Sequence, residues 1–123
     1  MNGVLEIEIK GQKHTLRFGV QAGLLFKSYI VQHKMKAGTL ESNYALLGDL
    51  FYCGLYGEAI RKQRQPLTYE EAMDLFDEFG SEENFANDSN RMWAAWGESS
   101  AGHELINLSQ QALKKKEELN AQP

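Results

Sequence analysis

The sequence contains little cysteine and little proline, and it has no long apolar run. Cys53 is the only cysteine in 123 residues, so no internal disulfide can form. With two prolines and a 42% share of hydrophobic residues, the composition is that of a globular chain and not of a disordered one. The start lacks a basic segment followed by an apolar run, and no later stretch reaches membrane-spanning length. We therefore expect a cytosolic protein that does not contact a membrane.

Signals for catalysis and for metal binding are also missing. The three histidines, His14, His33 and His103, have no cysteine or carboxylate at ligand spacing around them. The sequence has no nucleophile elbow, no phosphate-binding loop and no dinucleotide-binding glycine motif. Cys53 lies in the most apolar stretch, where a small core residue is the natural interpretation. We expect a protein that is not an enzyme, with no catalytic, cofactor or metal site.

The charges are unevenly distributed along the chain. Up to residue 65 there are nine Lys or Arg against five Asp or Glu, whereas residues 66–98 hold nine acids and the single base Arg91. The basic residues are spread over several predicted elements and do not follow one another along a single surface. Nucleic-acid binding is therefore not expected, and the middle of the chain should present an acidic face.

The segment 44–62 is apolar around nearly its whole circumference and is predicted to be a buried central helix. Leu47, Leu50 and Phe51 have the i, i+3, i+4 spacing of one helical face. The segment also contains three glycines, each of which costs about 1 kcal/mol relative to alanine inside a helix. We expect these glycines to lie where another part of the backbone comes close, and they are Gly48, Gly54 and Gly57.

Before this helix, the pattern predicts a β-hairpin and one further helix. Residues 4–10 alternate between apolar and charged side chains, Gly11 supplies a turn, and residues 15–18 form the returning strand. Leu5, Ile7 and Ile9 should face the core. Residues 20–35 follow as a helix, and the apolar stripe expected to pack inward consists of Val20, Leu24, Val31 and Met35, widened by Phe26 and Ile30.

After the central helix, Thr68 and Glu71 form a capping-box pattern that predicts a helix ending at Gly80. Residues 81–90 are polar and are predicted to be a loop. A short helix at 91–96 and a last helix at 103–119 complete the pattern. The expected fold is α+β and mostly α: an N-terminal β-hairpin packed on a bundle of about four to five helices around the buried helix 44–62. Residues 1–98 should form one domain, followed by a C-terminal helix and polar tail at 99–123.

Four features of residues 4–80 occur in a characteristic order. They are the short hairpin, the Phe18-Gly19 entry into a helix, the apolar segment from Leu50 to Leu55, and the capping segment from Pro66 to Ala72 after a short basic link. In this order they resemble the tail assembly chaperones of long-tailed (siphovirus-type) bacteriophages and prophages. The tryptophan segment and the C-terminal helix lie outside the resemblance.

The resemblance implies a non-enzymatic protein that binds the tape measure protein and assists tail tube assembly, with the tail tube protein as a further partner. It would act in the cytoplasm of the bacterial host and be absent from the mature virion. Proteins of this family tend to self-associate, which agrees with an exposed hairpin edge. The alternative is an adaptor or regulatory module of a mobile element, such as an antitoxin or a head-tail connector component.

A chaperone for a long helical partner needs exposed apolar anchors framed by charge. We therefore expect the partner-binding face to include four aromatic residues, Trp93, Trp96, Phe79 and Phe85. The acidic helix after Thr68 would steer basic segments of the partner toward this face.

Overall fold

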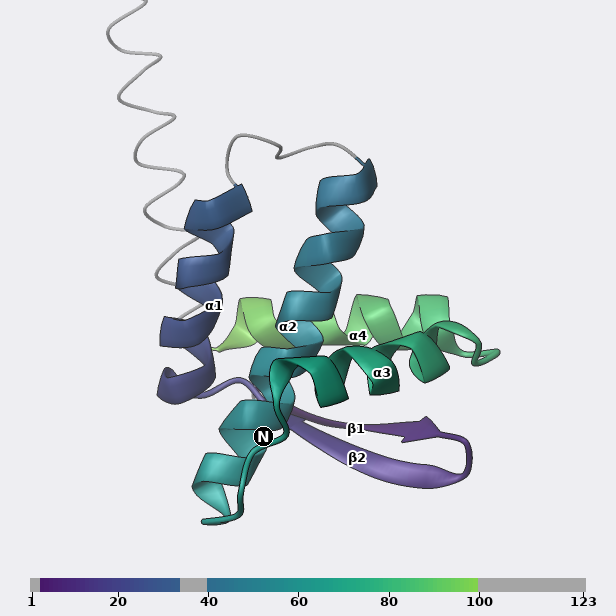
Figure 1. Ribbon diagram of the computed structural model, residues 1–123, viewed down its shortest axis with the longest axis horizontal. Helices are drawn as coiled ribbons and strands as arrows, with labels where there is room; N and C mark the ends of the chain where they lie inside the picture. Colours follow the sequence, from purple (N-terminus) through teal and green to yellow (C-terminus); the bar gives the residue numbers. More distant parts are fainter. Residues whose placement is uncertain (1–2, 34–39, 100–123) are drawn as a thin grey trace, which may run out of the picture.

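The computed structural model describes residues 3–33 and 40–99, which form an N-terminal hairpin and four helices (Figure 1). The fold is therefore α+β and mostly α, as predicted. The elements are β1 (Val4–Ile9), β2 (Gln12–Arg17), α1 (Val20–His33), α2 (Leu40–Arg61), α3 (Tyr69–Gly80) and α4 (Phe85–Glu98). The predicted C-terminal helix at 103–119 lies outside the described residues.

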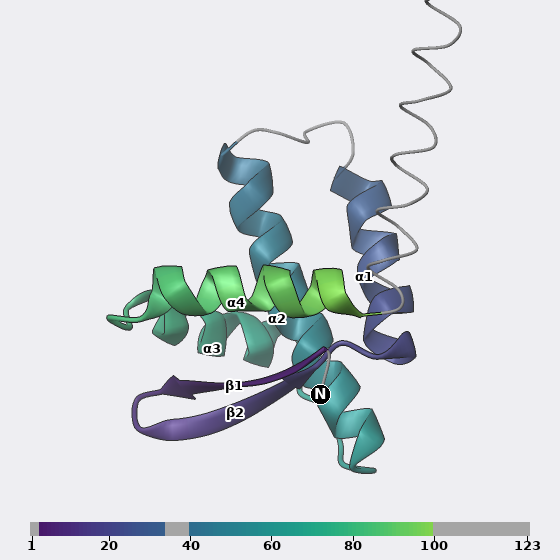
Figure 2. The same ribbon diagram turned by 180° about the vertical axis from the view of Figure 1, so that it is seen from behind.

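The long helix α2 runs through the middle of the molecule, and the other elements cover it. In Figure 1, α1 lies alongside its first half, and the hairpin lies near its second half. Figure 2, the view from behind, shows α4 crossing in front of α2, with the C-terminal end of α4 beside α1. Leu50, Phe51 and Cys53 of α2 are completely buried, which confirms that this helix is the core. It begins four residues earlier than predicted.

The hairpin closes through a two-residue turn. Lys10 and Gly11 both have positive φ angles, 52° and 79°, as the turn that matches the twist of paired strands requires. Ile9 therefore pairs directly with Gln12, so β2 begins three residues before the predicted start of the returning strand. The alternation was predicted correctly, because the buried side chains of β1 are Leu5, Ile7 and Ile9.

The prediction that another part of the backbone approaches the glycines of α2 is confirmed for Gly57, whereas Gly54 and Gly48 meet side-chain atoms. A Cβ atom on Gly57 would lie 2.2 Å from the backbone carbonyl oxygen of Arg17, and one on Gly54 would lie 2.8 Å from the Cβ of Leu16. Gly48 instead faces the flexible side chains of α3. The missing side chains of Gly54 and Gly57 therefore let β2 lie directly against α2.

The inward face of α1 was predicted correctly only for Phe26 and Ile30, which pack in and against the core. Val20, Leu24 and Val31, which were expected to pack inward, are 67%, 61% and 62% exposed. The buried face carries the predicted Phe26 together with Ala22, and both are almost fully inaccessible. Ala22 is small enough to pack closely against Gly57, so the face of α1 that carries Ala22 lies against α2. Met35, the fourth member of the predicted stripe, lies outside the described residues.

The segment predicted as a polar loop at 81–90 is largely helical, because α4 already begins at Phe85. Phe85 packs against Phe79 with a ring distance of 4.8 Å, and the Asp88 carboxylate pairs with Arg91 at 2.8 Å. These contacts stabilise a helix start whose own sequence has little helical preference. Asp88 is a buried residue inside the helix, and the N-cap position is Asn84.

The capping box at α3 is present as predicted. The Thr68 hydroxyl accepts a hydrogen bond from the amide of Glu71 at 3.1 Å, and the Thr68 amide donates to the Glu71 carboxylate at 2.9 Å. We expect Thr68→Ala to lower the free energy of unfolding by about 1 kcal/mol, since one amide loses its acceptor. Urea unfolding measures this loss. A Thr68→Ser variant should keep most of the stability, and equal losses in both variants would contradict the capping role.

Candidate functional site

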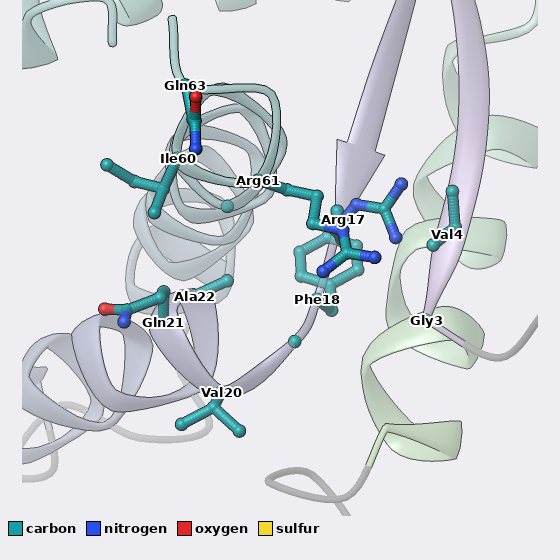
Figure 3. Close-up of a pocket in the computed structure, with 12 residues that line it drawn as sticks. Gly3, Val4, Arg17, Phe18, Val20, Gln21, Ala22, Ile60, Arg61 and Gln63 are labelled. Carbon is teal, nitrogen blue, oxygen red and sulfur yellow. The ribbon is translucent and has the colours of Figure 1, made fainter. Parts of the chain in front are cut away.

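A pocket of about 490 Å³ opens where the base of the hairpin meets the start of α1 and the end of α2 (Figure 3). Its walls are mainly apolar and are formed by Val4, Phe18, Val20, Ala22 and Ile60. This volume lies within the usual range for sites that bind a small molecule or anchor a side chain of a partner. The pocket is therefore the candidate functional site.

Two arginines line this pocket, and Arg61 gives it a positive charge, since Arg17 is paired with Glu58. Arg17 comes from the end of β2 and Arg61 from the last turn of α2, and Figure 3 shows both side chains extending toward each other beside the ring of Phe18. The N-terminal turn of α1 lies at the same pocket, and the positive end of a helix dipole adds to this field. The site therefore favours an acidic group that is flanked by apolar ones.

The position of Arg17 is fixed by a buried partner. Its Nε atom donates to the Oε1 atom of Glu58 at 3.1 Å, and Glu58 is only 5% exposed. Arg61 is exposed, and in residues 3–33 and 40–99 it forms no ion pair. Arg61 is accordingly the cation of this pocket that is better placed to meet a ligand.

A second polar cluster lies inside the fold, between α2 and α3. The carboxylate of Asp49, which is 2% exposed, accepts a hydrogen bond of 2.7 Å from the Tyr69 hydroxyl. Burial and this hydrogen bond raise the pKa of Tyr69, and burial raises the pKa of Tyr29 to about 12. Tyr29 stacks on Tyr69 at a ring distance of 6.1 Å. This buried hydrogen bond is a structural contact that joins α3 to α2.

Two further reactive side chains of the described residues, Cys53 and His14, are buried or partly buried. Burial raises the pKa of the Cys53 thiol, so Cys53 is a poor nucleophile. Burial lowers the pKa of His14, and its Nε2 atom is buried without a hydrogen-bond partner. Across the described parts of the chain, no three His, Cys, Asp or Glu side chains are grouped to hold a metal ion. None of the helices described is long and apolar enough to cross a membrane.

The four aromatic residues predicted to bind a partner lie in two different environments. Phe79 is fully buried and Trp96 is 6% exposed, so these two belong to the core and are not available at the surface. Phe85 is partly buried against Phe79. Trp93 is 38% exposed and packs near Phe26 of α1 at a ring distance of 6.1 Å. Trp93 is the predicted anchor that offers the most surface to a partner.

The predicted acidic face is partly occupied by contacts within the chain. Lys10 at the hairpin tip pairs with Glu78 of α3 at 3.4 Å, and its amide donates to Glu82. The hairpin edges are also partly covered. Arg91 donates to the carbonyl oxygen of Glu6 on β1 at 3.3 Å, and Gly57 packs on the carbonyl of Arg17 on β2. Self-association through a hairpin edge stays a prediction.

Comparisons with protein-family models, with curated proteins and with solved structures find no significant match to this chain. The pocket residues were not identified from the sequence, because they come from three separate segments. The basic excess of residues 1–65 was the available signal. It could not show that the fold brings Arg17 and Arg61 to one pocket.

Proposed function

We propose that this protein is a non-enzymatic tail assembly chaperone of a long-tailed bacteriophage or prophage. In this proposal it binds the tape measure protein in the host cytoplasm and assists assembly of the tail tube. The observation that supports the proposal most directly is the pocket at the base of the hairpin, which combines apolar walls with Arg17 and Arg61. The order of elements from the hairpin to the capping box of α3 agrees with the resemblance on which the proposal is based.

The partner segment that fits this pocket is an amphipathic helix with an acidic residue beside its apolar face. The apolar side chain would enter between Phe18 and Ile60, and the acid would meet Arg61. Apolar burial supplies affinity, whereas the charge pair fixes orientation and raises the association rate. The charge of the pocket therefore calls for acidic partner segments at this site. The steering of basic partner segments by the acidic helix α3 concerns another face and stays a prediction.

Co-expression with the tape measure protein of the same phage or prophage tests this function. We expect the tape measure protein to be retained with the affinity-tagged wild-type chain. We expect Arg61→Glu to reduce retention at least tenfold, because it places like charges together at the pocket. Retention on the affinity matrix, with far-UV circular dichroism of each variant, measures both binding and folding.

The matched control is Arg64→Glu, which makes the same charge change three residues away and outside the pocket lining. This variant should retain the partner as the wild type does. Failure of the wild type to retain the tape measure protein even at low salt would rule out the chaperone function. Equal losses for the two variants would rule out the pocket as the binding site.

A further inference from the structure

A surface of tyrosines lies where α3 packs on α2, a crossing that Figure 1 shows. Tyr44 of α2 is 51% exposed, and Tyr69 of α3 is 42% exposed. Met73 lies between them and is partly buried, with its sulfur 3.4 Å from the position of a Cβ on Gly48. Tyr44 also packs on Phe76 at a ring distance of 5.4 Å. Tyr44, Tyr69 and Met73 form what we call the tyrosine surface, which extends over about two turns of α3.

The ring of Tyr69 is held in place by contacts inside the fold. Its hydroxyl donates to the Asp49 carboxylate at 2.7 Å, and its ring lies 6.1 Å from that of Tyr29 and 5.4 Å from that of Tyr52. Because Asp49 is only 2% exposed, the part of Tyr69 that a partner can reach is the ring. A side chain that is already fixed loses little conformational entropy when a partner binds. Tyr69 therefore has the properties of an aromatic anchor at an interface.

A row of three acids runs along α3 beside the tyrosine surface. Glu70, Asp74 and Asp77 are spaced four and three residues apart, so they share one side of the helix, and all three are exposed. Glu70 directly follows Tyr69 and Asp74 directly follows Met73, which places the row about 100° further round the helix. Within the part of the chain that the structure describes, none of the three forms an ion pair. The tyrosine surface is therefore bordered by uncompensated negative charge.

The charge of this border selects the kind of partner that the surface fits. A helix with Lys or Arg along the edge of its apolar face would place apolar side chains on the rings and its cations on the acid row. The same cations can also lie over the ring of Tyr69, whose quadrupole attracts them. A symmetric dimer pairs the surface with a copy of itself, which offers the acid row no cation. A basic partner helix therefore complements the surface better than a second copy does.

We propose that the tyrosine surface and its acid row bind the apolar face of a basic amphipathic helix in a partner protein. The two tyrosines and the methionine contact the apolar side chains, and the acid row pairs with the Lys or Arg side chains. None of these residues lines the pocket that contains Arg61, whose charge has the opposite sign. The inference does not rest on the proposed function, because it concerns other residues and a partner segment of opposite charge.

Two synthetic peptides test this proposal with the full-length protein. Both are amphipathic helices of about 15 residues with the same leucine face, and they differ only in the residues that border it, lysine in one and glutamate in the other. Isothermal titration calorimetry should give a Kd at least tenfold lower for the lysine peptide, and this difference should shrink as salt is added. The lysine peptide should also shift the amide signals of Tyr44, Tyr69 and Met73. Equal affinities, or shifts confined to other residues, would overturn the proposal.

Variants of the protein separate this surface from its net charge. Asp74→Lys with Asp77→Lys should weaken binding of the lysine peptide at least tenfold, because the acid row becomes repulsive. The matched control is Glu83→Lys with Glu98→Lys, which makes the same charge change at two exposed acids outside the surface and should leave the Kd within about twofold. Far-UV circular dichroism checks that each variant is folded. Equal losses in the two variants would show that net charge alone attracts the peptide and would overturn the proposal.

Sedimentation equilibrium distinguishes a basic partner from a second copy. Tyr44→Ala removes an anchor that is half exposed, so it should weaken binding of the lysine peptide at least tenfold without unfolding the chain. In the absence of peptide, the wild type and Tyr44→Ala should have the same mass. If the wild type is a dimer and Tyr44→Ala is a monomer, the occupant of the surface is a second copy and the proposal is wrong.

Discussion

We expect Gly57→Ala to lower the free energy of unfolding by about 3 kcal/mol or more, because the new methyl group has no space. Its carbon would lie 2.2 Å from the carbonyl oxygen of Arg17, a backbone atom that cannot move without displacing β2. The Cβ of Ala22 lies 3.1 Å away on another side, so the helix cannot shift freely toward α1 either. The hairpin must therefore separate from α2.

The helical preference of alanine opposes this loss by only about 1 kcal/mol, so the steric effect should dominate. Gly48→Ala is the matched control, since its methyl group would meet the ring of Phe76 at 3.3 Å and the sulfur of Met73 at 3.4 Å. These side-chain atoms can move, so we expect a change within about 1 kcal/mol of wild type. Urea unfolding followed by circular dichroism compares the two. Equal stability of Gly57→Ala and wild type would contradict the close approach of β2 to α2.

The close approach at Gly57 could be predicted from the sequence, because glycine destabilises the interior of a helix relative to alanine. A glycine in an apolar helix therefore indicates a position where a larger side chain would not fit. Alternation likewise identified the buried face of β1, and the Thr68 capping box identified the start of α3. In each case the signal is local: it depends on residues that are a few positions apart. Local patterns of this kind are the part of the fold that a single sequence reveals.

The inward face of α1 could not be predicted in this way, since the helix has apolar residues on two sides. Periodicity finds both sides but cannot tell which of them meets α2. The choice depends on the fit of Ala22 against Gly57 and of Phe26 against Trp96, whose rings are 4.9 Å apart. These contacts join residues far apart in the sequence. The candidate pocket could not be predicted either, because its lining residues also lie far apart in the sequence.

The aromatic residues Phe79 of α3 and Trp93 of α4 show how a functional expectation depends on such contacts. Aromatic side chains bind partners and also fill cores, and their sequence does not separate the two roles. Phe79 stacks on Phe51 at a ring distance of 5.5 Å and meets Phe85 at 4.8 Å, which assigns it to the core. Trp93 lies at the surface of the same region. The two residues should therefore respond differently to truncation.

We expect Phe79→Ala to lower the free energy of unfolding by about 3 to 5 kcal/mol, because it removes a fully buried ring and leaves a cavity between α2, α3 and α4. Trp93→Ala should cost less than about 2 kcal/mol, since more than a third of the side chain already contacts water. Urea unfolding of both variants measures the difference. A loss for Trp93→Ala as large as that for Phe79→Ala would place Trp93 in the core and remove it as a partner contact. A small loss for Phe79→Ala would contradict the packing of α3 on α2, because removing a ring that packs on Phe51 and Phe85 should leave a cavity.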